Sequence, residues 1–327
     1  MLNAAIIGLG RWGRYLVDSV QGKSKKIRFV AGYTKTKSNA QEYCDDASID
    51  LRDDYFEITN DPDVDAVVLA TPHTQHAKQI IAAAEAGKHV FTEKPFALNS
   101  ASAKSAVQAC KKSGVTIALG HNRRFMENIM AMKAMVDNGE LGTLLHIDGN
   151  QSADLGAAVT TWRNSRDESP AGGMTSLGIH ALDCMIHLGG RVAEIDCYST
   201  RRSTKLNIDD ATASLVRFEN GMTGTLVSLA ATPRIWHIRI FGSEAWVEAN
   251  NHRTLSICRG GSIEVKNFVD SPYPHLSSLS YELEAFAEEA LGGLPYIIPP
   301  DQMVHGVAVL EAIIKSAESG KRVKPIF

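Results

Sequence analysis

A short glycine-rich segment near the start of the chain constrains the fold more than any other feature. Residues 8–13 read GLGRWG, after an apolar run at residues 4–7 and before an amphipathic stretch. That order predicts a strand, a tight loop and a helix. In a G-x-G-x-x-G loop the first glycine permits the turn, the second lets a pyrophosphate approach the backbone, and the third lets helix and strand pack closely. We therefore interpret the segment as a dinucleotide-binding loop formed by Gly8, Gly10, Arg11, Trp12 and Gly13.

The first third of the chain alternates short apolar runs with helix-like segments. The expected strands lie at residues 4–7, 27–33, 66–70, 90–92 and 115–119, and the expected helices at residues 11–20, 74–86 and 101–113. Buried strands joined by helices form a parallel sheet covered on both faces. The sequence thus predicts an α/β protein whose first domain, residues 1–121, is a dinucleotide-binding Rossmann domain.

Beyond residue 122 the pattern changes to alternating segments between turn signals. Helices are expected at residues 124–138, from 172 to about 188, at 281–291 and at 302–319, and strands at residues 195–201, 211–218, 223–230, 236–241, 246–249 and 255–258. Turn residues at 219–221 and 242–243 indicate hairpins. We expect a second α/β domain, residues 122–327, with an open, mostly antiparallel sheet and with its last helix packing back near the Rossmann domain.

The overall composition excludes several classes of protein. Hydrophobic residues make up 44% and charged residues 22%, with a formal net charge of −3. This balance gives no electrostatic footprint for nucleic acid or an anionic membrane, and no apolar run approaches the roughly 20 residues that span a bilayer. The five cysteines lack CxxC spacing and fit a reducing compartment. With Met1 running almost directly into the first strand, we expect a cytoplasmic protein without nucleic-acid or membrane partners.

The end of the second expected strand indicates which dinucleotide is preferred. NAD-preferring sites usually carry an acidic residue there to bind the ribose hydroxyls, whereas residues 33–37 of this chain read YTKTK. A hydroxyl and two ammonium groups stand where a carboxylate would repel a 2′-phosphate. We expect NADP to be preferred over NAD, with Thr34 and Lys35 on the phosphate. The alternative interpretation is that these residues form a solvated polar loop without a role in cofactor binding.

Further motifs follow the glycine loop in a fixed order. They read DPDVDAV at residues 61–67, ATPHTQH at 70–76, EKP at 93–95, GHNRRF at 120–125 and GGMTSLGIHALD at 172–183. Nearly end to end, this set resembles the Gfo/Idh/MocA family of glucose–fructose oxidoreductases and inositol dehydrogenases. The resemblance implies hydride transfer between NAD(P) and a carbinol or carbonyl carbon of a small sugar, cyclitol or cyclic diol. It also implies a second domain that binds substrate and whose sheet face joins subunits into a homodimer or homotetramer.

The resemblance carries roles onto particular residues. In the family the lysine of E-K-P approaches the nicotinamide and the reacting hydroxyl, which makes Lys94 the expected proton relay. A histidine of near-neutral pKa is a natural base for a hydroxyl proton, so His180 is expected to share that task, with Asp183 holding its tautomer or contacting substrate. Other expected cofactor contacts are Ala70, Thr71, Pro72, His76 and Glu93. The alternatives are that His76 caps a helix and that Glu93 orients the turn. Expected substrate contacts are Arg123, Trp162, Arg163 and Ser176.

Ser176 departs from the family pattern, because many members carry an aspartate four residues before the histidine. A serine hydrogen-bonds a hydroxyl but is not an anionic partner at neutral pH. The departure leaves an alternative function open, namely a non-catalytic NADP-binding regulator or sensor with an altered substrate pocket.

The helix that carries His180 also raises the question of a metal. Ser176, His180, Asp183 and His187 recur at helical spacing and are expected on one face. A zinc site from His180, Cys184 and His187 is conceivable by spacing, but no further ligand cluster is visible. We therefore expect no metal, and we interpret His187 as a histidine of the helix core.

Overall fold

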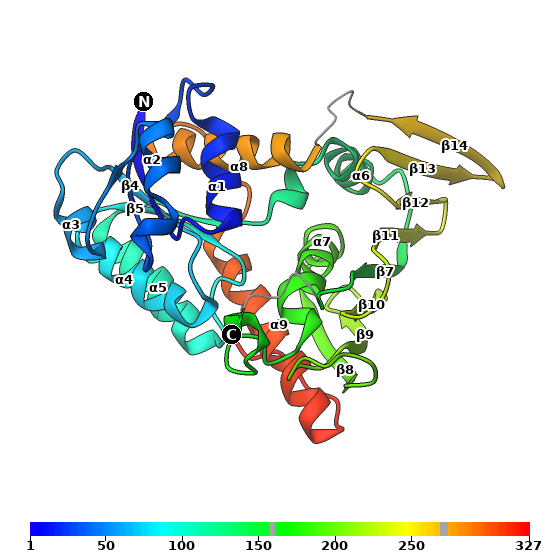
Figure 1. Cartoon of the computed structure of the whole chain (residues 1–327). Helices are drawn as coiled ribbons and strands as arrows, with labels where there is room; N and C mark the ends of the chain where they lie inside the picture. Colours follow the sequence, from blue (N-terminus) through cyan, green and yellow to red (C-terminus); the bar gives the residue numbers. More distant parts are fainter. Residues whose placement is uncertain (157–160, 269–273) are drawn as a thin grey trace. The chain divides into compact units, whose positions relative to one another are not determined.

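The computed structural model describes residues 1–156, 161–268 and 274–327. The chain forms two compact units (Figure 1). Unit 1 comprises Met1–Ala97, Ala101–Asn122 and His275–Val304, and unit 2 comprises Leu98–Ser100, Arg123–Pro274 and His305–Phe327. Among the described residues, no helix is both long and apolar enough to cross a membrane.

Unit 1 is built on a parallel sheet, drawn in blue to cyan in Figure 1. Its described strands follow the order β3-β2-β1-β4-β5-β6, and every pairing is parallel. The strands are β1 (Leu2–Ile7), β2 (Ile27–Tyr33), β3 (Asp50–Leu51), β4 (Ala66–Leu69), β5 (His89–Glu93) and β6 (Ile117–Gly120). The accompanying helices are α1 (Arg11–Val20), α2 (Gln41–Ala47), α3 (Tyr55–Asn60), α4 (His76–Glu85), α5 (Ser100–Ser113) and α8 (Pro274–Ala290), with short 3₁₀ turns η1 (Lys37–Asn39) and η2 (His73–Gln75).

The parallel sheet expected from the sequence is confirmed. Strand β2 and helix α1 begin and end where predicted, because each has a strong local pattern between turn residues. The prediction misses β3, α2 and α3. Strand β3 has only two residues, and α3 begins at an acidic cap in which Asp54 accepts a hydrogen bond from the Glu57 backbone N–H at 2.8 Å. Elements this short carry too little periodicity to be recognised.

Unit 2 contains a larger sheet, drawn in green to yellow in Figure 1. Its described strands follow the order β14-β13-β12-β11-β7-β10-β9-β8, antiparallel except for β7 beside β10, which confirms the predicted mostly antiparallel sheet. The strands are β7 (Leu144–Ser152), β8 (Val192–Thr200), β9 (Ala211–Phe218), β10 (Thr223–Leu229), β11 (Ile235–Gly242), β12 (Ala245–Ala249), β13 (Thr254–Arg259) and β14 (Ser262–Asn267). Its helices are α6 (Glu127–Asp137), α7 (Ile179–Gly189) and α9 (Pro300–Ser319), and the first residues of α9 belong to unit 1. Three short turns accompany them, namely η3 (Asn122–Phe125), η4 (Thr161–Asn164) and the π-helical turn η5 (Met174–Gly178).

Strand β7 lies in the interior of this sheet, yet the sequence does not predict it. Its central residues, Asp148, Gly149 and Asn150, are depleted in strands generally. The tertiary structure supplies the reason for them, since a Cβ at Gly149 would lie 2.7 Å from the sulfur of Met185 on α7. The glycine is therefore required by close helix packing rather than by the strand itself. Strand β14 is also missed, because all of its side chains are exposed.

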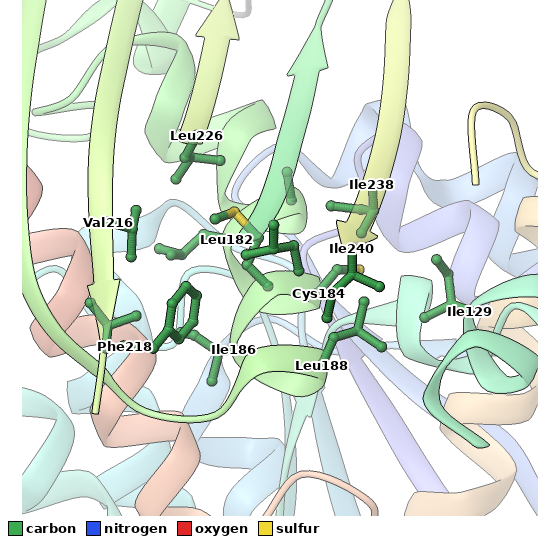
Figure 2. Close-up of a cluster of buried hydrophobic side chains, with 14 of the residues drawn as sticks. Ile129, Leu182, Cys184, Ile186, Leu188, Val216, Phe218, Leu226, Ile238 and Ile240 are labelled. Atoms are coloured by element: carbon green, nitrogen blue, oxygen red, sulfur yellow. The ribbon is translucent and has the colours of Figure 1, made fainter. Parts of the chain in front are cut away.

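Helix α7 supplies the core of unit 2. Every one of its residues except His187 is buried, including the polar His180 and Asp183. Figure 2 shows Leu182 and Ile186 of α7 among side chains from the sheet, including Val216, Phe218, Leu226, Ile238 and Ile240. Burying each such side chain contributes about 1.5–3 kcal/mol. This layer holds α7 firmly against one face of the sheet.

Candidate functional site

The glycine loop has the geometry of a phosphate cradle. Gly8 has φ of +100°, and a Cβ at Gly13 would lie 1.9 Å from the carbonyl oxygen of Gly8, so the chain's own packing requires both glycines. Gly10 differs, because a Cβ there would meet nothing within 4 Å and its φ of −72° suits any residue. The absent Cβ leaves the N-terminus of α1, with its backbone N–H groups, open to an anionic group. The loop therefore fits a bound dinucleotide.

A cavity of about 670 Å³ lies beside this loop. It is bordered by Gly10 and Arg11 of the loop, by Thr34 at the end of β2, and by side chains of α1 and α2. The ribose end of a dinucleotide is recognised at this edge of a Rossmann sheet. The cavity therefore unites three of the residues predicted to bind the cofactor.

Arg14 is a cation of this cavity that the sequence analysis missed. Its Nε donates to the Leu9 carbonyl at 3.3 Å, its Nη2 donates to the Asn39 carbonyl, and its guanidinium stands 4.8 Å from the centre of the Tyr43 ring. The Tyr43 hydroxyl donates to Asp18 at 2.7 Å, and burial raises the pKa of that hydroxyl. These contacts hold Arg14 at the cavity wall. Its position four residues after Gly10, one helical turn further along α1, was the available signal.

Lys35 and Trp12 are among the predicted cofactor residues that do not line the cavity. Lys35 is exposed on the loop after β2, while Lys37 forms an ion pair with Asp53 at 2.7 Å. The Trp12 ring packs edge-on against Tyr15, with ring centres 6.1 Å apart. Contacts of Lys35 and Trp12 with a cofactor stay predictions.

Lys94 follows the carboxyl end of β5, the edge at which open α/β sheets bind ligands. It precedes Pro95 through a cis peptide bond, and its backbone N–H donates to the carboxylate of the buried Glu93 at 3.3 Å. The predicted segment Ala70, Thr71 and Pro72 follows the neighbouring strand β4. The parallel sheet thus brings the two predicted cofactor segments to one edge.

His76 joins these two segments. Its Nδ1 lies 2.8 Å from the Pro95 carbonyl oxygen and its Nε2 lies 3.0 Å from the Thr71 carbonyl oxygen. A neutral imidazole donates to only one carbonyl, and the imidazolium donates to both. Since the ring is fully buried, it fixes the turn that carries Lys94. The predicted contact of His76 with a cofactor stays a prediction.

The segment before His180 differs from the predicted single helix. A π-helical turn, Met174–Gly178, precedes α7, and Gly172 is left-handed with φ of +54°. A Cβ at Gly172 would lie 2.1 Å from the Asp209 carbonyl oxygen. Because a π turn is wider than an α turn, Ser176 and His180 do not have the α-helical spacing that the sequence suggests. His180 itself is buried in the first turn of α7, 6% exposed.

Asp183 is bound by an arginine that the sequence analysis passed over. Arg124 donates from Nε to Oδ2 at 2.8 Å and from Nη2 to Oδ1 at 2.7 Å, and both side chains are buried. Such a bidentate pair fixes both carboxylate oxygens. It ties η3 to α7 one turn beyond His180. The predicted catalytic role of Asp183 stays a prediction.

His187 adjoins the same pair and is expected to make the protein acid-sensitive. Burial, followed by the nearby Arg124 guanidinium 3.3 Å from Nδ1, lowers the pKa of His187 to about 4. Between pH 4 and the ordinary value near 6.5, the unfolded chain binds a proton that the folded chain does not, so stability falls as the pH is lowered.

We expect this residue to remove about 3 kcal/mol of unfolding free energy between pH 7 and pH 4. Urea unfolding at several pH values measures it. In the variant His187→Asn the unfolding free energy should fall less steeply with decreasing pH than in the wild type. The fall that remains reports other groups with lowered pKa values, among them His89 and His237, for which burial is the main cause, and the carboxyl group of Glu311. If the unfolding free energy of the two proteins depended on pH in the same way, His187 would not be a source of the acid sensitivity.

The remaining predicted substrate residues form two stacked pairs. The Arg123 guanidinium lies 5.5 Å from the centre of the Trp236 ring, and that of Arg163 lies 4.0 Å from the centre of the Trp162 ring. Across residues 1–156, 161–268 and 274–327, no three His, Cys, Asp or Glu side chains gather as a metal-binding group.

Comparisons with known proteins cover most of the chain. The family model described as an oxidoreductase family with an NAD-binding Rossmann fold matches residues 2–121, and the GFO/IDH/MocA C-terminal domain matches residues 129–248. A Bacillus subtilis scyllo-inositol 2-dehydrogenase (NAD(+)) is 27% identical, over 91% of this chain and 88% of the relative. A Thermotoga maritima myo-inositol 2-dehydrogenase is 26% identical over 99% and 98%.

Solved structures show the same fold. Levoglucosan dehydrogenase, in complex with NADH and levoglucosan, superposes with a TM-score of 0.89 over 100% of both chains at 21% identity. At this identity the likeness establishes the fold.

Proposed function

Because the chain belongs to the Gfo/Idh/MocA family of oxidoreductases, we propose that it transfers hydride between NADP and a carbinol or carbonyl carbon of a small sugar, cyclitol or cyclic diol. The observation that carries this proposal is the edge of the parallel sheet, where Lys94 and the glycine loop follow strands of one sheet. The relatives named for inositol and levoglucosan support a polyhydroxylated substrate.

The proposed cofactor preference rests on the cavity beside α1. Gly8, Gly10 and Gly13 would receive the pyrophosphate, and the cavity between Arg14 and Thr34 would receive the ribose. Arginine suits a phosphate because its planar guanidinium donates two parallel hydrogen bonds. No acidic residue follows β2 within residues 33–37 to repel a 2′-phosphate. These features favour NADP, although two of the relatives are named for NAD(+) or NADH.

Proton handling is assigned to Lys94 and His180. The bound nicotinamide would supply or accept the hydride. As hydride leaves a carbinol carbon, the hydroxyl proton must leave the oxygen, and a lysine or histidine of suitable pKa takes it. Lys94 is held by His76, and His180 by the start of α7. Ser176 would hydrogen-bond substrate, and Arg123, Trp162 and Arg163 would contact its hydroxyls.

We also propose that the uncovered face of the larger sheet joins subunits in a homodimer or homotetramer. Tyr198 on β8 and Leu215 on β9 alternate with the buried Cys197 and Val216, so they point away from α7. They are 74% and 63% exposed, which is unusual for such large side chains on adjacent strands.

Native mass spectrometry with NADP and NAD in equal amounts tests the cofactor and the assembly together. A dimer or tetramer that carries NADP supports both proposals. A polyol panel of myo-inositol, scyllo-inositol, levoglucosan and glucose then tests turnover. Cofactor binding without turnover of any polyol would favour the regulator alternative, and absence of any bound dinucleotide would overturn the proposed function.

Substitution of Arg14 or of Lys35 should separate the two cofactors. We expect Arg14→Met to weaken NADP binding about 10- to 100-fold, the value of a charge-assisted hydrogen bond, and to change NAD binding far less. Lys35→Asp should act in the same direction, because its carboxylate repels a 2′-phosphate. Fluorescence titration with each dinucleotide measures both constants. Lys37→Met is the matched control, since Lys37 is paired with Asp53. Equal losses for NADP and NAD would contradict the assignment.

A further inference from the structure

Two polar side chains face each other on the covered side of the larger sheet. In the pairing of β7 with β11, Trp236 lies directly opposite Gln151. Alternation along β11 places Trp236 on the same face as Ile238 and Ile240, which Figure 2 shows in the layer beside α7. Directly opposed residues have Cβ atoms about 4.5–5.5 Å apart. The indole and the amide are therefore neighbours beneath the helical layer.

Neither polar atom is satisfied within the described structure. Trp236 is 7% exposed and its indole Nε1 is buried without a hydrogen-bond partner, and the same holds for the Oε1 atom of Gln151. Leaving a buried donor or acceptor unpaired costs about 1–3 kcal/mol. Native proteins seldom retain such groups, and those retained call for an explanation such as a bound ligand. Here the donor and the acceptor belong to directly opposed residues of adjacent strands.

Each of the two residues makes further contacts within unit 2. Ser228 on β10 donates from Oγ to the Gln151 carbonyl at 2.9 Å. The Trp236 ring has the guanidinium of Arg123 5.5 Å from its centre, and its centre lies 6.2 Å from that of the His252 ring.

The pair lies in the layer that carries His180. A Cβ at Gly178, two residues before His180, would lie 2.7 Å from the Ser228 Cβ. Ser228 in turn bonds the backbone of Gln151 on the adjacent strand. The π-helical turn and the start of α7 therefore pack against the strand next to Gln151. Gln151 is thus one strand away from the residue that contacts the segment proposed for proton handling.

We propose that Gln151 and Trp236 bind one hydroxyl group of the substrate. The indole N–H donates a hydrogen bond to the hydroxyl oxygen, and the hydroxyl donates a hydrogen bond to Gln151 Oε1. A carboxylate has no proton for Oε1 and an ammonium group has no acceptor for the indole, so the pair selects a neutral hydroxyl. The assignment rests on the proposed function, and it adds the residues that recognise a neutral polyol over a sugar acid or an amino sugar.

Isosteric variants test the pair. Trp236→Phe keeps a ring beside Arg123 and removes the N–H, and Gln151→Met keeps the length and removes the amide. Each should raise KM for the polyol about tenfold, the value of one neutral hydrogen bond, with kcat within about twofold. The Tm of the free protein should hold or rise, because the deleted atoms have no partner there. Trp246→Phe, on the opposite face of the sheet, is the matched control and should leave KM unchanged.

The outcomes separate this inference from the proposed function. An unchanged KM in both variants, whether or not the Tm falls, would contradict substrate binding by Gln151 and Trp236. Turnover of a polyol by the wild type would still support the proposed function in that case. If the wild type turns over none of the four polyols, thermal shift with NADP and each polyol decides. If a polyol raises the Tm of the wild type and of neither variant, the result supports substrate binding by Gln151 and Trp236. If no polyol raises the Tm of the wild type, both this inference and the proposed function are contradicted.

Discussion

Replacing Lys94 by methionine is expected to lower kcat with the best polyol about 10²- to 10⁴-fold, the usual contribution of a positioned acid or base. Methionine keeps most of the length of lysine and removes the ammonium group. Affinity for NADP should stay within about twofold, because binding rests mainly on the glycine loop and the cavity of α1. Steady-state absorbance of the reduced cofactor measures kcat, and fluorescence titration measures affinity.

The control for this substitution is Lys78→Met, on the exposed side of α4, which should leave both quantities unchanged. A Lys94→Met protein that retains wild-type kcat would remove Lys94 from the mechanism. A loss of NADP affinity equal to the loss of kcat would instead make Lys94 a cofactor-binding residue only. The two measurements therefore distinguish proton handling from cofactor binding.

The parts of the fold that were predictable are those fixed by local pattern. Helix α1 and strand β9 match their predicted limits because each alternates apolar and polar residues with a regular period and ends at turn residues. Strand β7 was not predictable in this way. Its Asp148 and Gly149 suit a loop by composition, and only the approach of Met185 explains the glycine.

The same division holds for the candidate site. Lys94, Thr71 and the glycine loop were predictable because motifs mark the ends of parallel strands. The residues that hold or complete the site were not, since their partners are distant in sequence: Arg14 binds the Asn39 carbonyl, and Arg124 binds Asp183. The π-helical turn before α7 was not predicted for a related reason. An inserted turn leaves the apolar composition intact while it shifts the faces on which side chains lie.

The buried pair of Arg124 and Asp183 should carry the largest stability effect in the molecule. Arg124→Met leaves the Asp183 carboxylate buried without its cation, which costs about 3–5 kcal/mol of unfolding free energy. Asp183→Leu should cost a similar amount by stranding the guanidinium. The double variant Arg124→Met/Asp183→Leu should cost much less than the sum, because apolar replacement of both partners leaves no buried charge. Urea unfolding of the four proteins gives the coupling energy.

The double variant also decides what Asp183 contributes to the reaction. If the carboxylate only fixes α7 through Arg124, a folded double variant should keep kcat within about tenfold of the wild type, since the apolar pair holds η3 against the helix in the same place. If Asp183 itself holds the His180 tautomer or contacts substrate, kcat should fall about 10²-fold or more despite recovered stability. Additive stability losses would show instead that the two side chains do not act as a pair. Stability and kcat, measured on the same protein, thus separate a residue that positions the helix from one that takes part in proton transfer.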